Sequence, residues 1–124
     1  MNIIQPAQMA VPKGHYSPGI AHNGVIYVSG QLPLNTDGAL VSGDVTEQAR
    51  CCLENIAVIL HSGGSSLGQV LKLNIFIADI ADWGKVNAVV AERFGAHRPA
   101  RIVVPVNRLN YGCAIEIDAT ATTG

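Results

Sequence analysis

Charged and aromatic residues are scarce in this sequence. Charged side chains make up 14% of its 124 residues and aromatic ones 5%, whereas hydrophobic residues reach 48%. A small domain exposes a large share of its surface to water, and charged residues normally cover much of that surface. We therefore expect an aliphatic core, with part of the remaining apolar surface buried against other copies of the same chain.

The sequence also lacks a basic patch, a long apolar run and a leader-like start. Its 8 Lys and Arg residues are scattered and the formal net charge is −1, so binding to nucleic acid is not expected. Apolar runs are strand-sized, far below the ~20 residues of a membrane span. No basic segment followed by an apolar core indicates a signal peptide. We expect one domain over residues 1–124, without membrane association and in the cytoplasm.

The few cysteines and histidines show no metal-binding or disulfide pattern. Cys51 and Cys52 are neighbours inside a helical pattern and cannot form an ordinary structural bridge with each other. The third cysteine, Cys113, has no Cys-x-x-Cys or Cys/His partner at zinc-binding spacing. We predict structural roles for all three cysteines, a reducing compartment and no metal site.

Strand and helix patterns alternate along the chain. Asp44 predicts the start of the first helix, with Glu47 completing a capping-box-like pair, and Gly63-Gly64 its end. Asp79 or Asp82 caps a second helix that Gly95 ends. Strand patterns cover His15–Ile20 (a short, strand-like stretch), Val25–Ser29, Val70–Ile77, Arg101–Val106 and Ala114–Ala121.

The order β-β-α-β-α-β-β, with room for an extra strand at the start, predicts an α+β fold. Two helices of similar length that follow strands suit packing on one face of a mixed sheet. The opposite face then needs another cover, and we expect oligomerisation to supply it. In Val70–Ile77, the residues Leu71, Leu73, Ile75 and Ile77 alternate and should share one face.

An arginine and a glutamate stand out in the last two strands, which we expect to pair. Alternation puts Arg101 on one face of its strand and Glu116 among apolar neighbours on the other strand. If the apolar faces meet the helices, both side chains point to the helix-free side. Two interpretations remain open, an interfacial ion pair and a carboxylate clamp beside a proton-transfer group.

Two further residues are candidates for contact with a ligand. The Tyr16 phenol can donate to a bound carboxylate or carbonyl, or it is an ordinary half-buried tyrosine. Gly30 allows close approach to the backbone, or it serves a turn. Ser29 lacks a Gly-x-Ser-x-Gly context, which argues against a serine hydrolase.

Several short motifs, in this order and spacing, resemble those of the RidA family, also called the YjgF family, over essentially the whole chain. The most specific is Arg98-Pro-Ala-Arg101 followed by Ile115-Glu-Ile117. The others are Tyr16-Ser17, Val28-Ser-Gly-Gln31, Gln48-Ala-Arg50, Leu53-Glu-Asn55 and Val86-Asn87. The resemblance implies a chorismate-mutase-like α+β fold and a homotrimer. Its sheets would line a central barrel, with helices outside and three clefts between subunits.

The same resemblance implies hydrolysis of reactive imines and enamines, such as 2-aminoacrylate or 2-iminobutanoate, to 2-oxo acids and ammonia. Arg101 would bind the substrate carboxylate and Glu116 would position water or relay protons. Tyr16 would contact the ligand, the Gly30 backbone would border the pocket, and Asn87 would also bind the substrate. An imine is already electrophilic, so orientation and an aligned water suffice, without cofactor or metal.

One position departs from the family pattern. Many imine deaminases of the family have a cysteine two residues after the arginine, where this chain has Val103, and Ile102 replaces a usually smaller residue. A backbone N–H at residue 103 can still bond a ligand. The departure keeps open a trimer that binds small carboxylates, or protects proteins, without turnover. An endoribonuclease is a third hypothesis, which the weak basic character disfavours.

Overall fold

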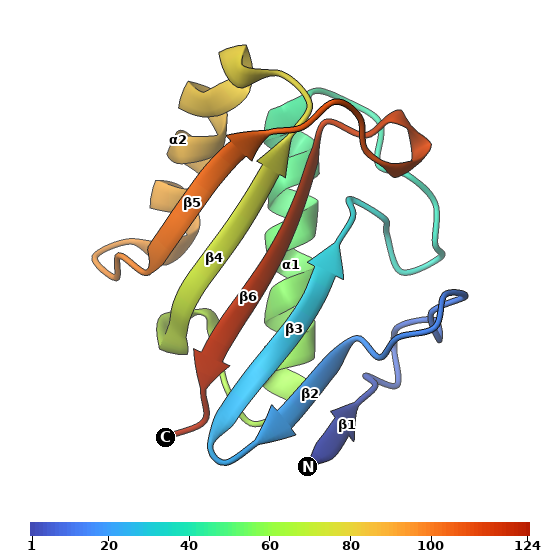
Figure 1. Cartoon of the computed structure of the whole chain (residues 1–124), viewed down its shortest axis with the longest axis vertical. Coiled ribbons are helices and arrows are strands. Elements are labelled where there is room, and N and C mark those ends of the chain that lie inside the picture. Colours follow the sequence, from blue (N-terminus) through green and yellow to red (C-terminus); the bar gives the residue numbers. More distant parts are fainter.

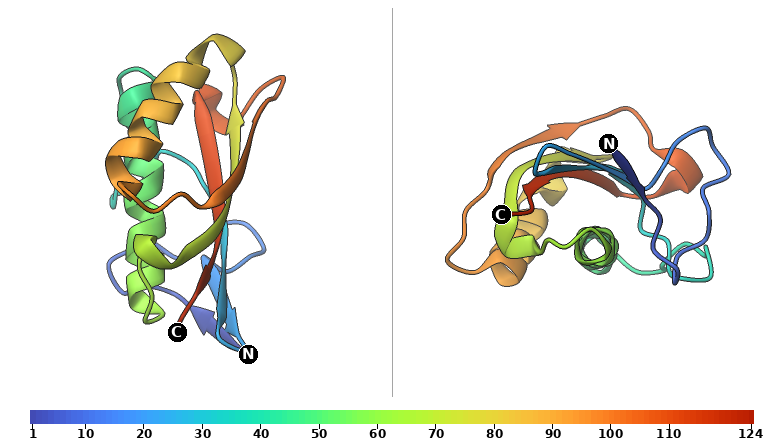
Figure 2. Two further views of the ribbon diagram at one scale, coloured as in Figure 1. Left: turned by 90° about the vertical axis from the view of Figure 1, so that its left-hand side faces the viewer. Right: turned by 90° about the horizontal axis from the view of Figure 1, so that it is seen from below.

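In the computed structural model, which describes residues 1–124, a six-stranded mixed sheet carries two α-helices on one face (Figures 1 and 2). The strands are β1 (Asn2–Ile4), β2 (Gly19–His22), β3 (Val25–Gln31), β4 (Val70–Ile77), β5 (Ala100–Pro105) and β6 (Ile115–Thr122). The helices are α1 (Val45–Ser62) and α2 (Trp83–Phe94). Short 3-10 helices lie at Leu67–Gln69, Ile80–Asp82 and Asn110–Gly112. The α+β class and the order of elements are confirmed, and β1 is the extra strand.

Both helices begin and end near the predicted residues. The Asp44 side chain accepts hydrogen bonds from the backbone N–H groups of Thr46 and Glu47 and so caps α1. Gly63 closes the helix, and Gly64 follows with a φ of 83°. Asp82 precedes α2 without a side-chain cap, whereas Asp79 caps the preceding 3-10 helix.

The core lies between the sheet and the two helices. Leu53, Ile56 and Ile59 of α1 are fully buried against strand residues such as Ile75 and Ile117. Burying an aliphatic side chain of this size stabilises the fold by about 1.5–3 kcal/mol. The amphipathic stripe of α1 therefore provides the surface on which the centre of the sheet packs.

The predicted face of β4 is correct except at its start. The register between β4 and β6 shifts between Val70 and Lys72, so that Leu71 is the extra residue of a bulge. Val70 is consequently buried in the core, and Leu71 is 50% exposed. The prediction that Leu71 shares the buried face was wrong because alternation fails across a bulge.

The strand order is β1-β2-β3-β6-β4-β5, with β4 and β5 parallel and the other pairs antiparallel. The prediction that the last two strands pair was therefore wrong, because β4 lies between them (Figure 1). Helix α2 connects β4 to β5 as the crossover that a parallel pair requires. Strand β5 is left at one edge of the sheet.

The sheet face opposite the helices has no cover within one protomer (Figure 2). Its exposed apolar side chains include Ile3, Tyr27 and Ile102, which are 67%, 53% and 45% exposed. The register of the strands puts all three on this face. Neither helix is long and apolar enough to cross a membrane.

Candidate functional site

Arg101 lies on the helix side of the sheet, which corrects the predicted orientation. It stands beside Leu73 in the parallel register of β4 and β5, and Leu73 is fully buried under the helices. Its Nη2 donates to Asn87 Oδ1 of α2 at 2.8 Å. The guanidinium carbon also lies 5.3 Å from the centroid of the Trp83 ring. Arg101 is thus held by α2 rather than by a strand.

Glu116 points to the opposite side of the sheet. Glu116 lies opposite Phe76 in the antiparallel register of β6 and β4. Its neighbours Ile115 and Ile117 are fully buried toward the helices. Burial of the half-exposed carboxyl raises the pKa of Glu116 from its usual value, and the nearby Asp118 raises it further. The carboxylate is therefore disposed to take up a proton more readily than an ordinary glutamate.

Gly30 lies against this carboxylate. The register between β3 and β6 shifts between Val28 and Gln31, so Gly30 belongs to an irregular segment of the strand. A Cβ atom at Gly30 would collide with Glu116 Oε2. The backbone at Gly30 thus permits close approach of the Glu116 carboxylate, and the predicted approach of a ligand stays a prediction.

Tyr16 lies in the loop before β2 and is 58% exposed. The loop is tied to β3 next to Gly30, because Ser29 Oγ donates to Ser17 O at 2.6 Å and Ser29 N donates to Pro18 O at 2.9 Å. The phenol has no hydrogen-bond partner in the protomer. It is an available donor in the loop before β2.

Val103 shares the helix-side face with Arg101, beside Ile75, and packs on the edge of the core. The candidate residues therefore form two groups. Arg101, Asn87 and Val103 lie around β5 and α2, and Glu116, Gly30 and Tyr16 lie around β3 and β6. The sequence pointed to all six residues but not to Trp83, whose only signal was an aromatic side chain at the start of a helix.

The two groups do not meet inside one protomer. Neither Arg101 nor Glu116 takes part in any of the ion pairs, which join Arg50 to Glu47 and Glu92, Lys85 to Asp44, and Arg93 to Glu54. Arg101 and Glu116 therefore form no ion pair within one protomer, and their interpretation as an interfacial ion pair stays a hypothesis. Both remain charged groups without an oppositely charged partner in the protomer.

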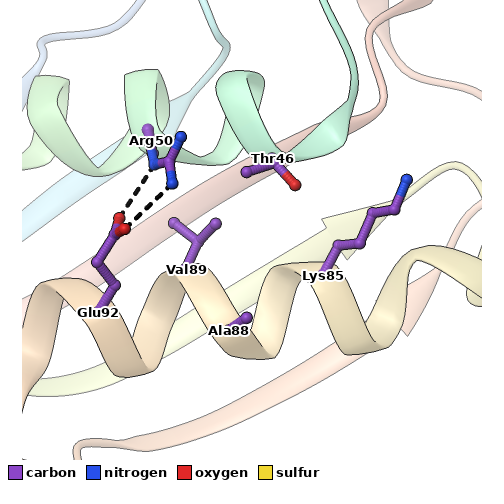
Figure 3. Close-up of a pocket in the computed structure, with 6 residues that line it drawn as sticks. All are labelled: Thr46, Arg50, Lys85, Ala88, Val89 and Glu92. Carbon is purple, nitrogen blue, oxygen red and sulfur yellow. Dashed lines mark hydrogen bonds and ion pairs between the residues drawn. The ribbon is translucent and has the colours of Figure 1, made fainter.

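A shallow groove of about 170 Å³ between α1 and α2 contains none of the predicted residues (Figure 3). Arg50 of α1 binds Glu92 of α2 there through Nε at 3.0 Å and Nη2 at 3.1 Å. Lys85 at its other end pairs with Asp44. Both cations of this groove are thus already paired with carboxylates. The groove resembles a salt-bridged contact between two helices more than a binding site. No cluster of His, Cys, Asp and Glu is arranged to hold a metal ion.

Comparison with known proteins connects this geometry to a family. The model of the family described as Endoribonuclease L-PSP matches residues 7–123. The chain belongs to this family, the YjgF/RidA family. A RutC family protein of Pyrococcus horikoshii is 41% identical to this YjgF/RidA chain over 111 residues, 89% of the chain and 88% of the relative. The suspected resemblance is confirmed.

Two other similar proteins have more specific descriptions. The human protein named 2-iminobutanoate/2-iminopropanoate deaminase is 36% identical over 123 residues, covering 98% of this chain and 90% of the relative. The crystal structure of Escherichia coli TdcF with bound serine superimposes with a TM-score of 0.93 at 32% identity and covers 100% of both chains. The YjgF/RidA fold is thus shared over the full length of the chain.

Proposed function

We propose that this protein is a cofactor-independent deaminase that hydrolyses 2-imino and enamine acids to 2-oxo acids and ammonia. The observation that carries the proposal is a pair of available charged groups, the guanidinium of Arg101 and the desolvated carboxyl of Glu116. The first suits a substrate carboxylate and the second suits proton transfer. The name of the human relative, a 2-iminobutanoate/2-iminopropanoate deaminase, supports the same reaction.

The proposed site lies between protomers of a homotrimer. Because Arg101 and Glu116 project from opposite faces of one sheet, a single cleft can contain both only if one comes from a neighbouring copy. Two features favour such an assembly. Strand β5 has an unpaired edge, which natural proteins usually cover, and the uncovered sheet face exposes Ile3, Tyr27 and Ile102.

In the proposed reaction, Arg101 of one protomer binds the substrate carboxylate through parallel N–H donors and fixes the imine carbon in place. Glu116 of the neighbour accepts a proton from water as the oxygen attacks that carbon. A C–O bond forms and the C=N bond becomes single. Glu116 then returns this proton to nitrogen, which gives a carbinolamine. Glu116 next transfers the hydroxyl proton of the carbinolamine to nitrogen, and the C–N bond breaks as the C=O bond forms. The products are the 2-oxo acid and ammonia.

The remaining candidates have supporting roles in this proposal. Tyr16 donates its phenol hydrogen to the ligand from the cleft wall, and the backbone at Gly30 borders the pocket. Val103 contributes its backbone N–H and an apolar surface where relatives with a cysteine have a thiol. Asn87 contacts Arg101 in the protomer and so influences the substrate through the arginine.

A coupled assay tests the proposal. A dehydratase generates 2-aminoacrylate or 2-iminobutanoate in situ, and the release of 2-oxo acid and ammonia is followed with and without the protein. We expect the wild type to accelerate release and Arg101→Ala to lower kcat/KM by at least about ten-fold, because charge-assisted hydrogen bonds to the carboxylate are lost. Equal rates for wild type, Arg101→Ala and the no-protein control across several imines would overturn it.

The second candidate is a trimer that binds small carboxylates without turnover. Val103 favours it, because the thiol present in many imine deaminases of the family is missing. Saturable binding of 2-oxobutanoate with no acceleration of imine hydrolysis would select this function. An RNA-cleavage assay on nuclease-free protein tests the activity named in the family description. With three free cysteines, the cytoplasm is the compartment that we propose.

A further inference from the structure

We propose that Trp83 and Asn87 are positioning residues that hold the Arg101 guanidinium so that it offers a carboxylate one bidentate edge in one orientation. This inference rests on the proposed function, because it concerns the carboxylate-binding group of that site. Both contacts come from α2 and reach across to the edge strand β5.

The hydrogen bond from Arg101 to Asn87 limits how a ligand can bind. A guanidinium has five N–H groups and presents two edges with parallel donors, one formed by Nε and Nη2 and the other by Nη1 and Nη2. Nη2 contributes one proton to each edge. Asn87 Oδ1 accepts one Nη2 proton at 2.8 Å, so one of the two edges is occupied and a single complete edge remains.

The Trp83 ring limits the orientation further. Its centroid lies 5.3 Å from the guanidinium carbon, within the range of a cation–π contact. The guanidinium carbon lies over the indole ring, so the ring restricts how the guanidinium can turn. Trp83 itself is still 42% exposed, so the contact lies at an accessible surface rather than inside the core.

Asn87 is an amide and not a carboxylate, which matters for the charge of the clamp. It accepts a hydrogen bond without neutralising Arg101, so the positive charge remains available to an anion. An aspartate at this position would form an ion pair with Arg101 and compete with the ligand. The arrangement therefore orients the arginine while preserving its charge.

The test measures binding of 2-oxobutanoate, a product of the proposed reaction, to the assembled protein by calorimetry. We expect Asn87→Asp to weaken binding by at least about ten-fold, because the guanidinium becomes paired. The control Asn2→Asp adds the same charge on β1, at the opposite edge of the sheet, and should leave the dissociation constant unchanged. Trp83→Leu should weaken binding by about two- to five-fold, and Trp83→Phe should restore most of the loss.

A second readout tests the contact itself without any ligand. Trp83 is the single tryptophan of the chain, so its fluorescence reports directly on Arg101. We expect Arg101→Leu to differ from the wild-type protein in its tryptophan emission and in the quenching of that emission by acrylamide. Unchanged fluorescence in Arg101→Leu, equal binding by Asn87→Asp and wild type, or no binding of 2-oxobutanoate to the wild type would each overturn the inference. Binding that depends on Asn87 without imine hydrolysis would overturn only the deaminase function.

Discussion

Arg101 and Glu116 lie on opposite faces of the same sheet, with β4 between their strands. The arginine is held from the helix side by Asn87, and the glutamate packs over Gly30 on the side without helices. In the proposed function, these two side chains are the two halves of a site, and one protomer presents them on opposite faces. In a closed ring, each protomer can offer one half to each neighbour.

The contact between Gly30 and Glu116 leaves no room at residue 30 for even a methyl side chain. A methyl group at Gly30 would collide with Glu116 Oε2, and the carboxylate would have to move. We expect Gly30→Ala to lower imine-hydrolysis kcat/KM by about a hundred-fold, as a displacement of about 1 Å of a catalytic group can. The control Gly68→Ala meets nothing closer than Ser66 Oγ at 3.7 Å and should retain wild-type activity.

The raised pKa of Glu116 predicts how stability changes with pH. Burial disfavours the charged carboxylate in the folded protein, so the folded state binds the proton more tightly than the unfolded state. Ionising Glu116 therefore costs stability as the pH rises through the raised pKa. Below the usual value of 4.5 the carboxyl is protonated in both states and the cost vanishes.

Glu116→Gln removes this cost and nearly preserves the shape of the side chain. We expect the Tm of Glu116→Gln to exceed that of the wild type near neutral pH, with the difference shrinking toward about pH 4. Differential scanning calorimetry across this range measures it. A difference in Tm that does not vary with pH would contradict the role of desolvation.

Burial should make the cysteine thiols unreactive in the folded protein. Cys52 and Cys113 are buried in the protomer, and burial raises the pKa of both thiols as well as that of the half-buried Cys51. We expect Ellman's reagent at neutral pH to react slowly with native protein and fully with all 3 cysteines after unfolding. Rapid reaction of a thiol in the native state would contradict this.

The sequence predicted the helices well because local signals control where they begin and end. Asp44 and the glycines after α1 act within one turn of the helix, so their effect is visible in a short stretch of residues. The buried stripe of α1 follows from helical periodicity for the same reason. Such features need no knowledge of the rest of the chain.

The orientation of Arg101 depended on long-range pairing and was therefore missed. The last two strands, β5 and β6, were expected to pair because a loop joins them. Instead β5 pairs in parallel with β4, and α2 connects the two in the sequence. A strand, a helix and a strand in succession are typical of a parallel crossover, and this was the signal that could have corrected the prediction. Leu71 was misplaced because a bulge changes alternation without an obvious sequence signal.

A mixed assembly tests most directly whether Arg101 and Glu116 act across a subunit boundary. Arg101→Ala and Glu116→Gln are made separately, and each should be nearly inactive as a homotrimer. Their subunits are then co-expressed with distinct tags, and trimers carrying both tags are purified and assayed for imine hydrolysis.

In a ring of three with both variants present, one of the three boundaries joins an intact Arg101 to an intact Glu116. The mixed trimers should therefore recover about one third of the wild-type rate, since each site draws on two neighbours. Light scattering verifies that the mixed species has the mass of a trimer. Activity no higher than that of either inactive variant would contradict a site shared between protomers.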